Sequence, residues 1–567
     1  WISLGGANYV GVGTHLKMYI SQGGAYYDVT PLRATTSAGD VTFSATNGQS
    51  TITVTDSSHE ALVNDFVTFS GAVTLNGNIT ASVLNQNYQI LTTPNANSYT
   101  ISAKDTSGNT VTASASDNGN GGGSVVGAYE IAVGYSIAVP IVGWSAGNFG
   151  DGTWGNGTTS ASSLRLWSQS TFGEDLLFAP RGGALYRWDA SAGLSARAVL
   201  VSSLGGASNV PTITNMILIS DTSRFVFCLG ANTLGTAAQD PLLIRWSDQE
   251  SLVNWTPAAT NQAGSIRLSQ GSSIITARQS RQEILVWTDS SLYALQYVGA
   301  PIVWSSQLVG QHTSIASQNA VGYANGVSYW MGMDKFYSYA GGLSQLRCDL
   351  RRHVFGDINA EQMDQVLAGT IEAFHEIWWF YCSSSSNTIN RYVVYNYEQD
   401  IWYYGNLART AWLDSGLQDF PLAATYTNNL VEHENGVDDN ETATPAAITA
   451  SISSAQFDID DGDRFGFVNR VIPDITFEGS TADNPAATLS LIPFNSSGSG
   501  ISNPTSEGGS DNGVITRSAT APVEKYTDRL DIRIRARQMS LKIESSGAGV
   551  TWQLGSPRID IRADGRR

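Results

Sequence analysis

The residues best suited to binding a metal ion lie in the acidic run DIDDGDRFG, residues 458–466. Asp458, Asp460 and Asp463 offer carboxylate oxygens, which are the ligands that Ca²⁺ prefers. An EF-hand loop would need a glutamate where this chain has Asn469, and no helix pattern flanks the run. We therefore expect a solvated acidic turn between strands, with no metal and no cofactor.

Side chains suited to catalysis are scattered along the chain. The six histidines form no HExxH motif or HxH pair, and neither GxSxG nor GxxxxGK[ST] occurs. WSDQESLVNW, residues 246–255, lacks the glycine turn of a sialidase-type Asp box, so a structural turn is expected there. A glycosidase needs two carboxylates in one pocket, and no pair stands out. The chain is predicted not to be an enzyme and to have no catalytic residues.

Two further sets of reactive side chains point to structural roles. Cys228, Cys348 and Cys382 are odd in number and far apart, which predicts buried free thiols. In RLDIRIRARQMSLKIES, residues 529–545, the arginines Arg533, Arg535 and Arg537 alternate with Ile532, Ile534 and Ala536. On a strand, the arginines would project from one face while the apolar residues enter a core. We predict that these arginines contact acidic residues of a neighbouring subunit, with nucleic acid as the alternative.

The composition favours an all-β protein that assembles with partners. Only 14% of the residues are charged, while Gly, Trp and Tyr are plentiful at 57, 15 and 23 residues. The net charge of −18 argues against tight binding of nucleic acid, which depends on Lys and Arg. No run of 18 apolar residues occurs, and WISLGGANYVG has no leader pattern, so no membrane insertion is expected.

An apolar strand, a short Gly/Ser/Asp turn and an aromatic strand recur through the middle of the chain. The units start at residues 176, 224, 283, 327 and 376, and the fifth has a longer loop and a third strand. This spacing fits the four-stranded blades of a propeller, so five or six blades are expected within residues 139–440. One helix pattern, NAEQMDQVLAGT at 359–370, predicts a helix between two blades with Asn359 as its N-cap.

The segments around the repeats predict three further parts. Residues 1–34 contain the strand–turn–strand THLKMYISQGGAYYDVTPLR, whose strands are expected to pair with the propeller or the C-terminal domain and could close the ring. Residues 35–138 alternate with period two and are rich in Thr, Ser, Asn and Gly, which predicts an inserted β-barrel or sandwich. Residues 441–567 contain a second series of strands and predict a C-terminal β-rich domain.

Four long runs, found in order along the chain, have a more specific pattern. They are RWSDQESLVNWTPAATNQAGSIRLSQGSSI (245–274), EIWWFYCS with NRYVVYNYEQDIWYYGNLART (376–410), DIDDGDRFGFVNRVIPDITFEG (458–479) and RQMSLKIESSGAGVTWQLGSPRIDIRADGRR (537–567). With these runs, residues 140–567 and the entry strands resemble the tail nozzle proteins of short-tailed bacteriophages, also called tail tubular protein B. The resemblance implies an all-β subunit with a β-propeller and a C-terminal platform domain, and it brings no active-site residues.

The same resemblance implies a function and a location. The chain would be a structural subunit of the virion tail, assembled in the host bacterial cytoplasm. Six copies would form a ring that continues the DNA ejection channel and contacts the tail adaptor and tail fibres or appendages. Double-stranded DNA would pass through transiently and without sequence specificity, and an acidic wall would let it slip. The candidates for lining that channel are Glu432, Glu434, Asp438 and Asp439.

Two alternatives belong to other functional classes. The first is an adhesin that binds carbohydrate or a receptor on the host surface, for which the insert at 35–138 is the expected agent. The second is a tail enzyme that degrades polysaccharide.

Overall fold

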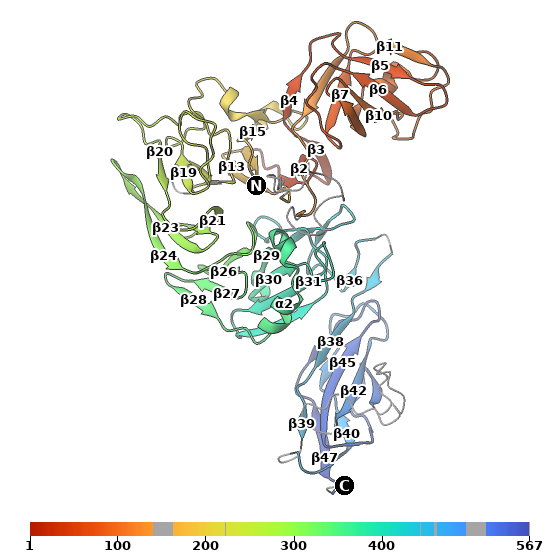
Figure 1. The fold of residues 1–567 in the computed structure, drawn as a ribbon. Coiled ribbons are helices and arrows are strands. Elements are labelled where there is room, and N and C mark those ends of the chain that lie inside the picture. The colour runs from red at the N-terminus through yellow and green to blue at the C-terminus, as the bar shows by residue number, and fades with distance from the viewer. Residues whose placement is uncertain (140–162, 222, 443, 459–461, 495–517, 566–567) are drawn as a thin grey trace, which may run out of the picture. The chain divides into compact units, whose positions relative to one another are not determined.

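The computed structural model describes residues 1–567 except 140–162, 222, 443, 459–461, 495–517 and 566–567 (Figure 1). It divides into two compact units. The first comprises Trp1–Asp419 and Ala423–Tyr426, and the second comprises Phe420–Leu422 and Thr427–Arg567. The regular secondary structure of both units is almost entirely antiparallel strand, which confirms the all-β prediction. No helix in the described part of the chain is long and apolar enough to span a membrane.

Five consecutive four-stranded antiparallel sheets form the body of the first unit, each with its strands in chain order. In Figure 1 they follow one another around an arc from yellow through green to teal. The first two sheets contain β13 (Trp167–Phe172), β14 (Asp175–Pro180), β15 (Tyr186–Trp188), β16 (Val199–Leu200), β17 (Met216–Ile219), β18 (Val226–Leu229), β19 (Leu243–Trp246) and β20 (Gly264–Arg267). The next three contain β21 (Ile274–Gln279), β22 (Ile284–Thr288), β23 (Ser291–Gly299), β24 (Val303–Gln311), β25 (Val321–Ala324), β26 (Val327–Met331), β27 (Phe336–Tyr339), β28 (Leu343–Leu346), β29 (Leu367–Ile371), β30 (Glu376–Tyr381), β31 (Arg391–Asn396) and β32 (Ile401–Gly405). This is the up-and-down topology of propeller blades.

The middle strands of each sheet produce the repeat seen in the sequence. They pair on both edges and pack on both faces, so every residue of β22 is buried, whereas the outer strand β20 alternates between half-buried and exposed residues. Four of the largest fully buried side chains lie on second or third strands of these sheets: Trp188, Trp287, Trp330 and Trp379. Burying such large rings is a main source of stability for a fold with many turns.

Hydrogen bonds and an ion pair connect the start of the series with its later sheets. Arg181 Nη2, just after β14, lies 2.8 Å from Asp364 Oδ2, which precedes β29. Gln362 binds the backbone of Ala138 through both ends of its amide, at 3.0 and 2.7 Å. Gln318 Nε2, which precedes β25, donates to the carbonyl of Trp167 at 3.2 Å. The first sheet is therefore held against the segments that precede the fourth and fifth sheets.

The entry strands differ from the expectation that they pair with the propeller or the platform. β1 (Val10–Gly13), β2 (Met18–Gln22) and β3 (Ala25–Asp28) form a three-stranded sheet of their own. This sheet packs on the first blade through side chains, with Gly13 so close to Trp167 that an added Cβ would lie 2.4 Å from the ring. Because glycines on β1 allow this close packing of faces, the contact does not depend on a shared strand edge.

The insert is a sandwich of two sheets. One has the order β11 (Asp117–Asn120), β5 (Thr42–Ala45), β6 (Thr51–Thr55), β10 (Ser98–Ser102), β9 (Thr92–Asn95), and the other β4 (Leu32–Thr35), β12 (Val126–Glu130), β7 (Phe66–Ser70), β8 (Asn87–Gln89). Phe43 and Phe69 meet edge to face between the sheets, with ring centroids 4.9 Å apart. Thr35 is the Cα partner of Ala128, so the two ends of the insert lie side by side within the first unit.

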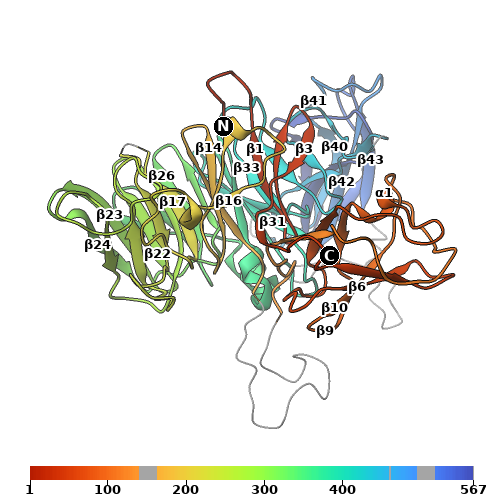
Figure 2. The ribbon, with the colours of Figure 1, turned by 90° about the horizontal axis from the view of Figure 1, so that it is seen from above.

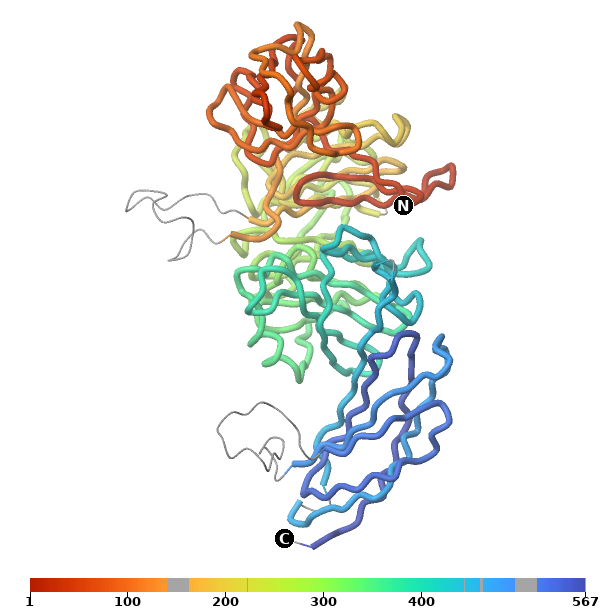
Figure 3. The backbone as a smooth tube through the Cα atoms, turned by 90° about the vertical axis from the view of Figure 1, so that its right-hand side faces the viewer, coloured from red at the N-terminus to blue at the C-terminus, as the bar shows by residue number. Residues whose placement is uncertain are grey.

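The second unit is also built from packed sheets around a core that includes Val468, Leu489 and Ile543. Its largest sheet has the order β38 (Ala450–Ser453), β45 (Gln538–Ser545), β42 (Ala486–Phe494), β43 (Ala519–Glu524), with β39 (Phe457–Asp458) also paired to β45. A second sheet has the order β44 (Ile534–Ala536), β40 (Gly466–Ile472), β47 (Arg558–Ala563). The smaller pairs are β36 (Asp438–Asp439) with β37 (Ala446–Ala447) and β41 (Ile475–Thr476) with β46 (Gln553–Leu554). Figure 3 shows this blue chain running back and forth in layers.

The chain passes from the first unit to the second through three short strands, β33 (Ala411–Leu413), β34 (Leu422–Ala424) and β35 (Leu430–Glu432). The helices are also short: α1 (Ala81–Leu84), α2 (Arg351–Asp357), η1 (Ala190–Ala192), η2 (Val201–Ser203), η3 (Ala360–Gln365) and η4 (Glu372–Phe374).

The helix predicted at 359–370 is wrong in length and type. Asn359 caps as expected, accepting the N–H of Glu361 at 3.0 Å, but the segment is a 3-10 helix that ends at Gln365. Leu367 already begins β29, because five residues from there pair with β30 and complete the fifth blade. Pairing within the sheet therefore outweighs the local helix signal.

Candidate functional site

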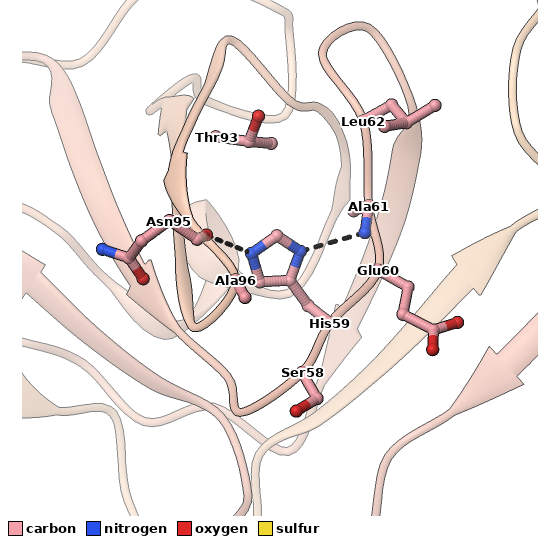
Figure 4. Close-up of a pocket in the computed structure, with 8 residues that line it drawn as sticks. All are labelled: Ser58, His59, Glu60, Ala61, Leu62, Thr93, Asn95 and Ala96. Atoms are coloured by element: carbon pink, nitrogen blue, oxygen red, sulfur yellow. Dashed lines mark hydrogen bonds between the residues drawn. The ribbon is translucent and has the colours of Figure 1, made fainter.

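A surface hollow with a volume of about 460 Å³ lies in the inserted sandwich (Figure 4). Its lining comes from the loop after β6, from β9 and from the turn that follows β9. The lining residues are Ser58, His59, Glu60, Ala61, Leu62, Thr93, Asn95 and Ala96. Most of its polar groups are hydroxyls and amides, with one carboxylate.

His59 joins the two walls of the hollow. Its Nε2 donates to the carbonyl of Asn95 at 3.1 Å, and its Nδ1 accepts the N–H of Ala61 at 3.0 Å (Figure 4). Because one ring nitrogen donates and the other accepts, the ring is neutral with its proton on Nε2. Both nitrogens are occupied, so His59 acts as a structural tie between the loops.

The backbone of the same loop is strained. Ser58 and Glu60 have φ values of 57° and 52°, in the left-handed region that residues with a side chain rarely adopt. Two hydrogen bonds hold this conformation: Asn97 Oδ1 accepts the N–H of Ser58 at 3.0 Å, and Arg33 Nη2 donates to the carbonyl of His59 at 2.8 Å. Glu60 points away from the His59 ring in Figure 4, so the two do not form an acid–base pair.

A buried chain of hydrogen bonds lies in the core of the same sandwich. The hydroxyl of Tyr129 donates to Asp56 Oδ2 at 2.5 Å, and the hydroxyls of Tyr99 and Tyr129 are 2.8 Å apart. Burial raises the pKa of both tyrosines, so both remain protonated donors. This chain stabilises the interior of the insert.

A second polar cluster joins three parts of the first unit. Lys17 Nζ, just before β2, lies 2.7 Å from Asp28 and 3.1 Å from Glu130, the last residue of β12. It also donates to Asn87 Oδ1 of the insert at 3.1 Å and lies 4.3 Å from the centre of the Phe66 ring. These contacts connect the entry sheet to the sandwich.

Arg197, from the segment before β16 of the first blade, completes this junction. Its Nη1 lies 2.9 Å from Glu130 and 3.3 Å from Asp28, and it donates to the carbonyl of Thr30 at 2.9 Å. Two cations therefore face two anions where the entry sheet, the insert and the first blade meet. Charges removed from water to this extent require such pairing to be tolerated.

The junction shifts the pKa values of two nearby groups. Burial raises the pKa of Asp28, but hydrogen bonds from Lys17 and Thr30 and the charges of Lys17 and Arg197 outweigh burial, leaving the pKa below its ordinary value. Burial and the negative charge of Asp28 raise the pKa of Tyr19 to about 12. At neutral pH the junction therefore contains an ionised aspartate and a protonated tyrosine.

Two further charged side chains, Asp414 and Arg278, bind the backbone of the first strands of two blades. Asp414 Oδ1 accepts the N–H of Thr370 in β29 at 2.7 Å, and Arg278 Nη2 of β21 donates to the carbonyl of Val321 in β25 at 3.3 Å. Both charged residues are exposed, and each binds a backbone group of a first strand. These side chains satisfy backbone groups that the sheet ladders leave unpaired.

The four acidic residues predicted to line a channel lie in the second unit, close together along the chain. Glu432 accepts from Asn435 at 2.5 Å, Asp438 accepts the N–H of Gly549 at 2.7 Å, and Asp439 accepts the N–H of Glu441 at 3.0 Å. Glu434 has a φ of 61° in the turn between β35 and β36. These contacts give the acids local structural roles, and their place on a channel wall stays a prediction.

The predicted alternation of arginines and apolar residues is confirmed, but Arg535 has a partner within the chain. Ile532, Ile534 and Ala536 are buried in the core of the second unit. Arg535 Nε lies 2.6 Å from Asp564 Oδ2, and its guanidinium lies 4.2 Å from the centre of the Phe465 ring. Arg537 also lies over Phe465, whereas Arg533 is exposed. Contact of the three arginines with a neighbouring subunit stays a prediction.

The cysteines and the WSDQESLVNW run contact other parts of the first unit, and two of the three cysteines are buried as predicted. Cys228 and Cys382 are buried and Cys348 is half-buried, all as free thiols, and burial raises the pKa of all three. The carboxylate of Asp248 in the WSDQESLVNW run accepts the N–H of Gln262 at 2.9 Å, and its carbonyl accepts the N–H of Ser251 at 3.2 Å in a turn. The acidic run at 458–466 lies partly outside the described residues, and the described remainder of the chain contains no group of three potential metal ligands.

Comparisons with known proteins identify no family. No family model and no curated protein matches the chain. Among solved structures, the extracellular domain of the putative one-component system BT4673 from B. thetaiotaomicron aligns with 98% of this chain and 73% of its own, at 9% identity and a TM-score of 0.30. Hsv2 of Kluyvelomyces marxianus aligns with 49% of this chain and 74% of its own, at 8% identity and a TM-score of 0.27. The phage phi92 endosialidase aligns with 77% of this chain and 64% of its own, at 9% identity and a TM-score of 0.17. Similarity at this level carries no argument about function.

Proposed function

We propose that the chain is a structural subunit of the tail nozzle of a short-tailed bacteriophage, one of six copies in a ring around the DNA ejection channel. The observation that carries this proposal is the resemblance of residues 245–274, 376–410, 458–479 and 537–567 to that family. The architecture agrees with it, because the chain combines a series of propeller blades with a separate C-terminal β-unit.

The chemistry of the described residues supports a role without catalysis. His59 has both ring nitrogens engaged, and the Lys17, Asp28, Glu130 and Arg197 charges neutralise one another at a junction. Asp248 and Asp414 bind backbone N–H groups. In these clusters the ionisable groups maintain the fold, which suits a component whose task is to keep its shape. The net charge of −18 suits a conduit that DNA passes without being held.

Electron microscopy tests the proposal. The purified chain, alone and with the tail adaptor protein of the same virus, is expected to form six-fold rings with an open channel, and the chain is expected in the tail of intact virions. A particle that remains a single copy under all these conditions, and a virion tail without the chain, would refute the nozzle assignment.

The hollow in the insert favours a second candidate function, adhesion to the host surface. Glu60 offers an exposed carboxylate at its rim, and exposed Leu62, Val63 and Leu91 lie nearby in the chain. Joining Thr35 directly to Ala128 removes the sandwich while retaining Glu130, because the two residues are Cα partners across β4 and β12. An adhesin role predicts that this deletion abolishes adsorption to host cells and leaves ring assembly intact. Unchanged adsorption would exclude the insert as the adhesin.

A further inference from the structure

The hairpin of β23 and β24 is longer than any other in the five blades. Each of its strands has nine residues, whereas the outer strands β16, β20, β28 and β32 have two, four, four and five. At its tip Tyr297, Val298 and Ile302 are 46, 52 and 65% exposed, although the Tyr297 ring also packs against Phe225, which directly precedes β18. Figure 2 shows β23 and β24 at one extremity of the first unit.

The outer edge of this hairpin lacks the usual protection against pairing with another chain. β24 is the last strand of its sheet and pairs on its outer edge with no other described strand. Native edge strands are commonly protected by charged residues or by proline. Residues 296–311 contain no Asp, Glu, Lys or Arg, and Val303–Gln311 contains no proline. An exposed apolar surface of this kind marks a contact with a partner.

A second unprotected edge occurs in the second unit. β38 is the edge strand of the largest sheet, and its outer side pairs with no described strand. Ile448 and Ile452 are 52 and 50% exposed there, and residues 442–456 contain no charged side chain. The chain thus has two uncharged strand edges with exposed apolar residues, one in each unit.

We propose that these two edges bind each other between copies: the β23–β24 hairpin of one copy lies along β38 of the next. The inference rests on the proposed ring. A chain with a net charge of −18 repels a second copy over most of its surface, and that repulsion is smallest where two uncharged surfaces meet. The two edges are also different surfaces, as a heterologous contact that closes into a ring requires. Backbone hydrogen bonds between the two edges would fix which residues of β24 and β38 lie opposite each other.

Crosslinking tests the contact directly in the full-length chain. Ile302→Cys and Ile452→Cys are introduced together with Cys348→Ser, since Cys228 and Cys382 are buried. Treatment of assembled rings with a flexible bis-maleimide is expected to yield a ladder of covalent oligomers. Each single-cysteine variant should yield none, because its partner position lacks a thiol. Rings that form normally but yield no ladder would overturn the proposed contact.

Charge insertion tests the energetics. Ile302→Glu or Ile452→Glu places a carboxylate in an uncharged contact, so each is expected to raise the concentration needed for ring assembly by about tenfold or more. Val73→Glu is the matched control, because Val73 is 54% exposed on the insert and lies outside both edges and the hollow. Mixing I302E with I452E should yield paired copies and no rings, because only one intact contact can form per pair.

The outcomes separate this inference from the proposed function. Rings that tolerate both glutamates as well as they tolerate V73E refute the contact and leave the nozzle assignment standing. Loss of tail appendage proteins from virions, with rings unaffected by I302E, would assign the hairpin to an appendage protein and also overturn the contact. Absence of rings from the unmodified chain and from virions would refute both.

Discussion

Lys17 and Glu130 form an ion pair 3.1 Å long, although 113 residues separate them and their side chains are only 8 and 1% exposed. Lys17 belongs to the entry sheet and Glu130 to the last strand of the inserted sandwich. Together with Asp28 and Arg197, the pair fixes the insert to the entry sheet and the first blade through side chains that water barely reaches. Removal of one partner from a buried pair is strongly destabilising, because it leaves an uncompensated charge in the interior.

Lys17→Met is expected to destabilise the first unit by about 3–5 kcal/mol, because it leaves buried carboxylates with one cation in place of two. The free energy of the first unfolding transition in urea would measure the effect. A protease should also cut the variant faster than the unmodified chain near the two ends of the insert.

Glu60→Gln is the control for that prediction. It removes an exposed pair, in which Arg33 Nη1 and Glu60 Oε2 are 4.0 Å apart and the Glu60 side chain is 84% exposed. Pairs of this kind contribute about 0–1 kcal/mol. If both variants unfold at the same urea concentration, the junction does not have the role assigned to it.

The junction also predicts loss of stability in acid. The pKa of Asp28 is lower in the folded chain than its ordinary value of 3.8, so the unfolded chain binds the proton more readily. The stabilisation is therefore complete above pH 3.8 and is lost as the pH falls through the folded pKa. Asp28→Asn removes this contribution, so its unfolding midpoint should fall less steeply than that of the unmodified chain below pH 4. Parallel curves would contradict the prediction.

A strand could be predicted from the sequence where its neighbours bury it on both faces, and could not where they leave it partly exposed. The middle strands of the blades, such as β22 and β30, were predictable because burial on both faces leaves continuous apolar runs. Outer strands such as β16 and β20 are short and partly exposed, so their pattern resembles that of loops. The five middle hairpins were therefore recognisable from the sequence, which left the number of blades at five or six, whereas most blade edges were not recognisable.

The candidate sites were harder to predict because their residues meet only after folding. Lys17 and Glu130 each stand in apolar surroundings, in LKMYI and AYEIAV, and that is the one signal that hinted at a buried charge. Nothing local connects them. No sequence motif likewise marks the role of His59, because its partners are backbone groups of Asn95 and Ala61.

Gly369→Ala tests the packing of β33 against the fifth blade. A Cβ at Gly369 would lie 2.6 Å from the Trp412 ring, which stacks at 15° on Trp378 and contacts Phe380. Because Trp412 has little room to move, we expect a loss of about 1–3 kcal/mol, measured by thermal unfolding. Gly356→Ala is the matched control: no atom lies within 4 Å of its added Cβ, and alanine in α2 should be neutral or stabilising. Equal effects of both substitutions would contradict the packing argument.

Arg535→Glu distinguishes a role within the chain from a role between copies. In the second unit Arg535 pairs with Asp564 and lies over Phe465, so R535E places two carboxylates together and removes a contact with the ring. We expect a loss of about 1 kcal/mol in the unfolding free energy of that unit, as for a partly exposed pair.

The exchange variant Arg535→Asp with Asp564→Arg decides between the two roles. It restores opposite charges within the chain, so the unfolding free energy of the second unit should return toward that of the unmodified chain. If Arg535 serves only its own unit, ring assembly recovers with stability. If it also binds an acidic surface of the next copy, assembly stays impaired in the exchange variant even though the fold is restored, because the position facing that copy is now acidic. Comparing unfolding in urea with ring formation in the same preparations separates these two results.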